Sequence, residues 1–483
     1  MNVTAYQDLD AIGLADLIKR GEASAEEAMS IAIGLAQSAH KRLNFLKFPK
    51  FEESLALARR HDAKLDRSVF SGVPFLYKDS GLASTRFESS IGSNFLGPMT
   101  YGQNSTFADR VEAAGFIPFA RTAVPELCMG PTTEAVANGG NTLNPWKLEL
   151  SCGGSSGGAA AAVAAGVVPV AHGSDGGGSI RIPAANCGLV GLKTSRGRFP
   201  MGPNDGDAWG DLICDGFLSR SVRDTAAALD AVGGPDAGAP FAAPTPTGSY
   251  LERLELKFDR PLKIALWTDG WDGCDPIDSH TMKALHYAAE QCRKLGHEVV
   301  EQAPADLDYA AYAAAHARVL ALSIHSTVLA VTGKRGYPLK EGELEFAIED
   351  GLKYSRTLGA HDYISALGVF RKIGRQLGQY MERYDLVLLP TVPVASARHG
   401  LLPRDAEFLE FRRRSCAYNP FVAISNASGQ PAISVPIYFT EDQGLPVGVQ
   451  FLGAYGDEDT LLRLAKGLED VAPWAHRYPF ERG

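Results

Sequence analysis

The sequence is short of the features that mark secreted, membrane-spanning and nucleic-acid-binding proteins. Its seven cysteines are scattered and include no C-x-x-C pair, so we expect neither a disulfide framework nor a zinc site, and a reducing, cytoplasmic environment. The opening residues, MNVTAYQDLD, lack the basic and then apolar segments of a secretory signal. The longest apolar run, residues 159–171, falls short of the roughly 20 residues that a membrane-spanning helix needs. The net charge of −9 argues against nucleic acid as the main partner, because phosphate binding needs a basic surface.

What the chain does contain is an alternation of helical and strand-like segments. With 483 residues, 45% of them hydrophobic, it can bury a large core. A helix is predicted after Ser24, where Glu27 completes a capping box, and the run 159–171 predicts a buried helix that leads into a strand. Further helices are predicted at 105–114, before Gly296 and over about 310–384, and strands at 116–120, 166–171, 262–267, 385–390, 431–439 and 445–453. This pattern predicts an α/β fold around a mixed sheet.

Two glycine-rich clusters each contain a serine: GGSSGG at 153–158 and GSDGGGSIRIP at 173–183. Glycine loses more backbone freedom on folding than any other residue, so such clusters indicate tight turns or backbone that approaches a ligand. Phosphate binding is disfavoured, because neither cluster continues into the G-K-[ST] of a P-loop. The first cluster fits the G-x-S-x-G of a nucleophile elbow, which would make the protein an α/β-hydrolase-type esterase with Ser155 as nucleophile. A third hypothesis uses both serines, with a lysine as the base.

A motif earlier in the chain favours the third hypothesis. GVPFLYKDSG at 72–81 places Lys78 beside Asp79, and this motif and the two serine clusters follow one another as in the amidase signature family, which the chain resembles. The resemblance continues through CGLVGLKTSRGRFP and the C-terminal NASGQPAISVPIYF. It implies a central mixed β-sheet flanked by helices on both sides. It also implies a single amidase domain over 1–483, with its core in about 60–230 and 385–470 and a less typical, cap-like segment at about 250–384.

The resemblance implies a Ser–cisSer–Lys triad, in which Ser179 is the nucleophile, Ser155 relays a proton and Lys78 is the base. A serine hydroxyl attacks well only when a neighbouring group takes its proton. A lysine can do so only when neutral, and burial favours the neutral amine. A hydroxyl can donate and accept at once, which suits Ser155 as a relay. Asp79 would stabilise the charged lysine unless its carboxylate points away.

The second glycine cluster offers donors for the oxyanion of a tetrahedral intermediate. We expect them to be the backbone N–H groups of Gly176, Gly177, Gly178 and Ser179. Glycine at 176 departs from the threonine, isoleucine or alanine usual in the family, which predicts a looser loop. Cys128 and its neighbour Met129, just after VPEL, are expected to line the substrate pocket; the alternative for Cys128 is a buried, inert thiol.

Five polar residues in or beside these motifs are expected to have structural roles: Asp79, Ser156, His172, Asp175 and Arg181. The sequence thus predicts an amidohydrolase that cleaves C–N bonds of small or oligomeric amides without a metal or organic cofactor. Within the family it looks most like hydrolases of nylon-type 6-aminohexanoate cyclic oligomers and of related xenobiotic and aryl amides. The alternatives are the esterase with Ser155 as nucleophile and a glutamine amidotransferase subunit. The expected partner is a small-molecule amide, with no nucleic acid or membrane and with a homodimer as the assembly to test.

Overall fold

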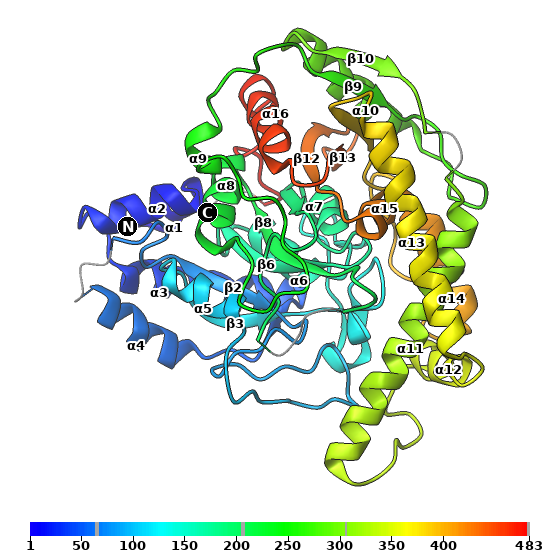
Figure 1. The fold of residues 1–483 in the computed structure, drawn as a ribbon. Coiled ribbons are helices and arrows are strands. Elements are labelled where there is room, and N and C mark those ends of the chain that lie inside the picture. Colours follow the sequence, from blue (N-terminus) through cyan, green and yellow to red (C-terminus); the bar gives the residue numbers. More distant parts are fainter. Residues whose placement is uncertain (63–66, 204–207, 305–306, 481–483) are drawn as a thin grey trace.

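The computed structural model describes residues 1–62, 67–203, 208–304 and 307–480, in which helices and strands alternate along the chain (Figure 1). The α-helices are α1 (Val3–Asp8), α2 (Ala11–Lys19), α3 (Ala25–Leu43), α4 (Phe51–Asp62), α5 (Thr106–Ala113), α6 (Gly157–Ala164), α7 (Arg181–Cys187), α8 (Val222–Val232), α9 (Tyr250–Arg253), α10 (Ser279–Lys294), α11 (Tyr309–Arg335), α12 (Phe346–Ser355), α13 (Ala360–Met381), α14 (Phe408–Tyr418), α15 (Pro420–Ser428) and α16 (Glu458–Val471). The strands are β1 (Leu46–Lys47), β2 (Pro74–Lys78), β3 (Ile117–Thr122), β4 (Glu134–Ala135), β5 (Gly140–Asn141), β6 (Val170–Asp175), β7 (Val190–Lys193), β8 (Cys214–Ser219), β9 (Lys263–Leu266), β10 (Glu298–Glu301), β11 (Leu386–Pro390), β12 (Ala432–Phe439) and β13 (Pro446–Gly453). Two 3-10 turns, Glu126–Cys128 and Val136–Asn138, lie between β3 and β5.

The largest sheet is mixed, as the sequence predicts. Its eight strands lie in the order β10-β9-β11-β13-β12-β7-β8-β6. β9 pairs in parallel with both β10 and β11, and the remaining neighbours are antiparallel. The predicted pair of C-terminal strands is therefore confirmed as β12 and β13 at the centre of the sheet.

Helices cover both faces of this sheet, because alternate residues of its central strands point to opposite sides. On β12, Ile433 and Val435 belong to the core that includes residues of α10 and α16. Their neighbour Ala432 belongs to a second core with residues of α13 and α15. The face towards α7 and α15 carries the glycine-serine motifs, so the candidate site lies between this sheet and its helical cover.

One predicted strand begins later than its apolar run suggests. The run 166–171 was expected to be extended throughout, but β6 starts at Val170. Gly166 takes a left-handed φ of +71° after α6, and Pro169 has no N–H to contribute to a ladder. β6 starts later and also ends later than predicted, at Asp175, so its last residues belong to the second serine motif.

A smaller sheet, β1-β3-β2, places the lysine motif. β2, which sequence reasoning did not identify as a strand, is fully buried and pairs in parallel with β3. Lys78 is its last residue, and its backbone N–H donates to Nδ1 of His172 on β6 over 3.1 Å. This bond joins the end of β2 to the strand that leads to Ser179.

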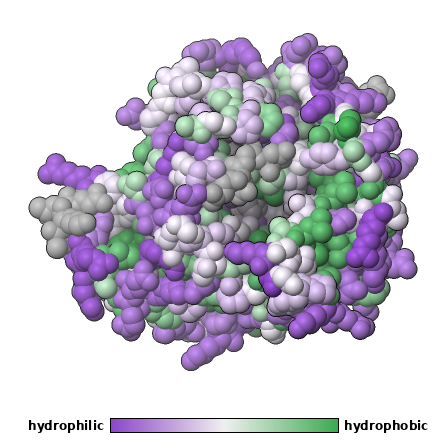
Figure 2. All heavy atoms as spheres, turned by 60° about the horizontal axis from the view of Figure 1, so that its bottom comes forward, coloured by the Kyte–Doolittle hydropathy of each residue, from purple (hydrophilic) through white to green (hydrophobic). Residues whose placement is uncertain are grey.

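The stretch from 309 to 381 is helical, as its composition predicts, and α11 packs against α12, α13 and α14. In the described chain, α11 is the one helix long and apolar enough to cross a membrane by length and composition, and 44% of its most apolar window is buried. Apolar side chains gather on the right of Figure 2, the side on which α11–α13 lie in Figure 1. Exposed residues of these helices include Leu329, Phe346 and Ile364. A separate cap domain stays a prediction.

Candidate active site

Lys78 meets the first serine cluster inside the protein. Its side chain is completely buried, and Nζ lies 2.8 Å from Ser155 Oγ. Nζ also donates to Ser174, at 2.9 Å to the hydroxyl and 3.1 Å to the carbonyl oxygen. Ser155 follows a cis peptide bond from Gly154 and stands just before α6. The structure thus brings together the predicted base and the predicted relay residue.

The surroundings of Lys78 favour the neutral amine. Burial lowers the pKa of Lys78, while Cys128, Asp175 and Asp215 act more weakly in the opposite direction. Asp79 points elsewhere: its carboxylate accepts from the hydroxyls of Ser89 (2.5 Å) and Ser90 (2.8 Å). Because the Asp79 carboxylate is bound to these serines and not to Lys78, burial can lower the pKa of Lys78 without opposition from Asp79.

Ser179 lies on the short loop between β6 and α7 and is half-buried. Its carbonyl oxygen accepts from the backbone N–H of Ser156 (3.1 Å), which ties the two serine clusters together. Asp175 holds the loop from inside: its carboxylate accepts from the N–H groups of Gly178 (2.7 Å) and Ile180 (3.1 Å), on either side of Ser179.

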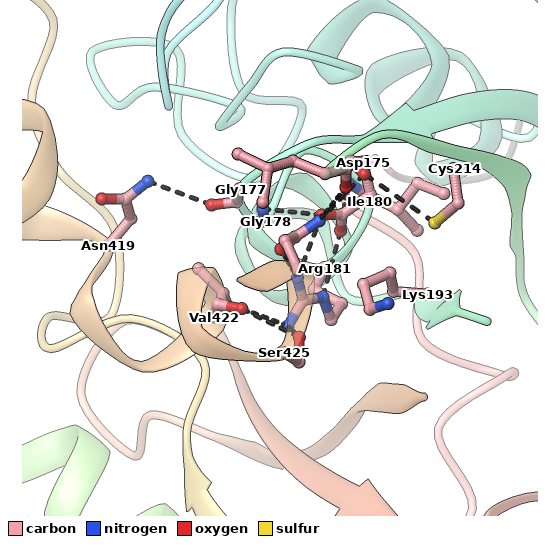
Figure 3. Close-up of polar contacts among 12 residues, drawn as sticks. Asp175, Gly177, Gly178, Ile180, Arg181, Lys193, Cys214, Asn419, Val422 and Ser425 are labelled. Atoms are coloured by element: carbon pink, nitrogen blue, oxygen red, sulfur yellow. Dashed lines mark hydrogen bonds and ion pairs between the residues drawn. The ribbon is translucent and has the colours of Figure 1, made fainter. Parts of the chain in front are cut away.

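Arg181 completes this clamp, as Figure 3 shows. Its Nε and Nη2 each lie 3.0 Å from the Asp175 carboxylate, and both side chains are completely buried. Burial acts to raise the pKa of Asp175, but the charge and hydrogen bonds of Arg181, with a bond from Asn426, outweigh it and hold that pKa below its ordinary range. Asp175 and Arg181 thus have the structural role that was expected.

One of the four predicted oxyanion donors has another partner. The Gly178 N–H is occupied by Asp175 and is not available to a substrate. The N–H groups of Gly176, Gly177 and Ser179 have no acceptor among the described residues. A Cβ at Gly176 would lie 2.8 Å from the Trp209 ring, so the indole occupies the space that a larger residue would need. The looser loop stays a prediction.

His172 and Ser156 are fixed by local hydrogen bonds. The ring of His172 accepts from the Lys78 backbone at Nδ1, and its Nε2 lies 3.0 Å from Asp215 Oδ1. Burial lowers the pKa of His172. Ser156 Oγ bonds to the backbone of Ser174 in both directions. Both side chains brace β6, and neither side chain has a hydrogen bond to Ser179 in the described chain.

Two cavities meet at the site. The larger, of about 610 Å³, is lined by Ser174, Asp215 and residues of α11, among others. The smaller, of about 20 Å³, is lined by Ser179 and Gly177. Cys128, Met129 and Trp209 line both, so the predicted pocket residues form the boundary between the two. Cys128 takes a left-handed φ of +58°, a conformation that non-glycine residues adopt rarely.

Sequence reasoning missed several residues of this site. Ser174 lies inside the second motif, and its position two residues after His172 on a strand could have placed it on the same face. Trp209, His316 and Arg412 lie outside every motif and reach the small cavity through tertiary packing alone. Their segments carry no sequence signal that distinguishes them from ordinary core.

Comparisons with known proteins agree with this geometry. The family model described as Amidase matches residues 27–462. The chain is 34% identical over 490 residues to a 6-aminohexanoate-cyclic-dimer hydrolase of Paenarthrobacter ureafaciens, covering 97% of this chain and 96% of that protein. The solved structure of 6-aminohexanoate cyclic dimer hydrolase with its substrate superimposes with a TM-score of 0.91 at 33% identity, over 98% of this chain and 99% of that one. A bacterial aryl acylamidase does so with a TM-score of 0.88 at 25% identity, again over 98% and 99%.

Proposed function

This chain belongs to the amidase family and is a hydrolase of amide bonds, and from that premise we propose that it works through an acyl-enzyme on Ser179. The observation that carries the proposal is the 2.8 Å contact between Lys78 Nζ and Ser155 Oγ in a completely buried setting. A neutral amine there can take the proton of Ser155 while Ser155 takes that of Ser179. On collapse of the intermediate, Ser155 returns a proton to the departing amine, and water then hydrolyses the ester.

The developing oxyanion is proposed to bind the backbone N–H groups of Gly176, Gly177 and Ser179. The clamp by Asp175 supports this role, because it fixes the backbone on both sides of the nucleophile. Donors that are held in place before the reaction stabilise the transition state without reorganising, and one such donor contributes about 2.7–4 kcal/mol.

The larger cavity is proposed to hold the substrate. Its volume of about 610 Å³ lies in the usual range for small-molecule sites, roughly 300–1,000 Å³. Apolar residues such as Ile91 and Leu322 alternate on its wall with hydroxyls such as Ser323 and Thr327. Such a wall suits a carbon chain or ring that carries amide groups. Together with the substrate named for the relatives, this supports small or oligomeric amides, cyclic or linear, as the substrate class.

We also propose the cytoplasm as the site of action. All seven cysteines are free thiols, and none of the described residues forms a disulfide. Retention of every thiol is typical of proteins in a reducing compartment.

A fluorophosphonate probe tests the mechanism directly. It should label one serine, and peptide mapping should place the adduct on Ser179. Ser155→Ala and Lys78→Met should slow labelling, because each interrupts proton removal. An adduct on Ser155, or labelling that is indifferent to Lys78, would favour the nucleophile elbow. Hydrolysis of anilides, aliphatic amides, cyclic amides and glutamine by the purified chain then defines the substrate class, and activity on glutamine alone would favour the amidotransferase alternative.

A further inference from the structure

The small cavity beside Ser179 is distinct from the one that holds the bulk of the substrate. Its volume of about 20 Å³ accommodates about one or two water-sized atoms. Three polar side chains on its wall are more than nine-tenths buried: His316 (3% exposed), Arg412 (4%) and Asn419 (6%). Each keeps one polar atom without a hydrogen-bond partner, namely His316 Nε2, Arg412 Nε and Asn419 Oδ1. Three such atoms around one cavity indicate an occupant that hydrogen-bonds to them, either a water molecule or a polar group of a ligand.

The hydrogen bond between two of these residues fixes what the cavity offers. Arg412 Nη2 lies 3.2 Å from His316 Nδ1. A guanidinium can only donate, so Nδ1 must be the acceptor. Burial and the charge of Arg412 lower the pKa of His316 far below its usual value, so the ring is neutral and its one proton is on Nε2. The cavity therefore presents two unused N–H donors, one of them from a cation.

Arg412 differs from the two arginines that follow it. Arg413 and Arg414 are exposed and pair with Glu410 on the same helix, at 2.7 Å each. Arg412 is buried, and none of the described carboxylates lies within salt-bridge distance of it. A buried charge without a counter-ion costs several kcal/mol of stability, whereas the same charge is useful once a ligand brings the opposite one.

The position of the cavity shows which part of a substrate would reach it. Asn419 Nδ2 donates to Gly177 O over 3.0 Å, as Figure 3 shows, and the His316 ring faces Gly177. The cavity thus lies against the nucleophile loop. Ser179 lines this cavity, and in the proposed mechanism Ser179 carries the acyl part of the substrate. We therefore assign a group bound here to the acyl part.

We propose that this cavity is a carboxylate subsite formed by Arg412 and His316, which selects amides whose acyl part carries a carboxylate a few bonds from the scissile carbonyl. The inference rests on the proposed acyl-enzyme at Ser179. The carboxylate directs one oxygen into the cavity, towards Arg412 and His316 and away from Asn419 Oδ1, the one unpartnered acceptor among these three side chains. Half-amides of short dicarboxylic acids are the simplest substrates of this class.

Calorimetric binding to a Ser179→Ala variant tests the subsite without catalysis. Succinamate and succinamide have the same length and differ in a carboxylate against a carboxamide. We expect succinamate, or the glutaric or adipic half-amide if the spacing is longer, to bind at least tenfold more tightly than its diamide. Arg412→Met should abolish that preference, and the matched control Arg413→Met should keep it. Equal binding of every half-amide and its diamide, or a preference that survives Arg412→Met, would overturn the proposal.

Two further measurements separate folding and function from recognition. Arg412→Met should unfold at the same temperature as its parent or a higher one, since it removes an uncompensated buried charge. If it does not fold, His316→Phe takes its place, and an unchanged succinamate preference there would count against the subsite. If the parent enzyme hydrolyses neutral anilides but Ser179→Ala binds half-amides and diamides equally, only the subsite is refuted. A carboxylate preference in binding, with no hydrolysis of any amide by the parent enzyme, would refute the proposed function alone.

Discussion

Asp175→Asn is the substitution that most directly tests whether the nucleophile loop is held from inside. The carboxylate accepts bonds from two backbone N–H groups, from two nitrogens of Arg181 and from Asn426 Nδ2 at 2.9 Å. In Asp175→Asn, the NH2 group of the amide would face either the backbone N–H groups or Arg181, and it cannot accept a hydrogen bond from either. It would also leave Arg181 buried without a counter-ion.

The expected loss follows from this geometry. Removing one partner of a buried ion pair costs about 3–5 kcal/mol. Typical domains have a total stability of about 5–15 kcal/mol, so the loss is a large fraction of it. Because Gly178 and Ile180 flank the nucleophile, we also expect kcat/KM to fall at least tenfold in the folded fraction. Urea unfolding gives the first quantity, and the initial rate on an activated anilide gives the second.

Glu458→Gln is the matched control. Glu458 is also completely buried, and it accepts from Arg198 Nη2 (2.9 Å) and the Ser195 N–H (2.7 Å) at the start of α16. It should lose a comparable free energy of unfolding and keep its kcat/KM. An Asp175→Asn variant that loses stability but keeps kcat/KM within twofold would show that the clamp does not position Ser179. A stability loss below about 1 kcal/mol would refute the ion-pair argument.

The same pair predicts resistance to acid. In the folded protein the pKa of Asp175 lies below its ordinary value, so the unfolded chain binds the proton more readily. The contribution of the ion pair is therefore complete above the unfolded pKa, about 3.9, and is lost only as the pH falls through the lower, folded value. Between those values the difference in stability between the parent and Asp175→Asn should shrink with falling pH, and a difference that is constant there would contradict the assignment.

The lysine relay, the imidazole behind it and the nucleophile loop carry the remaining predictions. kcat/KM should rise with pH through a midpoint below the roughly 10.4 of free lysine, because burial lowers the pKa of Lys78 and only the neutral amine accepts a proton; a pH–rate profile measures this midpoint. Ser174→Ala should move the midpoint to lower pH, since it removes a hydroxyl that accepts from the ammonium at 2.9 Å, and an upward movement would contradict a charged donor. His172→Gln should leave the rise of kcat/KM with pH at the same midpoint. If this rise disappears in the variant, the imidazole is the base. Gly178→Ala should lower the free energy of unfolding by more than about 1 kcal/mol in a urea titration, because its φ is +115° and the new methyl group would overlap Val422.

The residues of the proposed triad could be identified because they lie in short motifs with local constraints. Each glycine cluster and the Lys-Asp pair can be recognised within about ten residues of sequence. The order of these motifs matches the family, and this match predicted that Lys78 and Ser155 lie together. The oxyanion donors were less predictable. Whether a glycine N–H faces a substrate or a carboxylate depends on the rotation of single peptide groups, and Gly178 turned out to face Asp175.

The mixed sheet was predictable for a similar reason, since most of its strands are apolar runs bounded by turn residues. β2 was missed because its five residues include a lysine, which is unusual in a completely buried strand. The small cavity was not predictable at all. His316 and Arg412 come from α11 and α14, and only the packing of these helices against the nucleophile loop brings them together. The run FRRRS gives no sign that its first arginine points inward and the next two outward.

The buried cations of the site differ in a way that bears on what each can do. Arg181 has the carboxylate of Asp175 beside it and serves the architecture. Lys78 and Arg412 have no carboxylate within salt-bridge distance among the described residues. A buried cation in that position either loses its proton or takes an anion from a ligand. Lysine can take the first course and so becomes a base, whereas a guanidinium keeps its proton in proteins and is left with the second. The same physical condition, an unpaired charge away from water, therefore underlies both proposals: a proton acceptor at Lys78 and a binding group for carboxylate at Arg412.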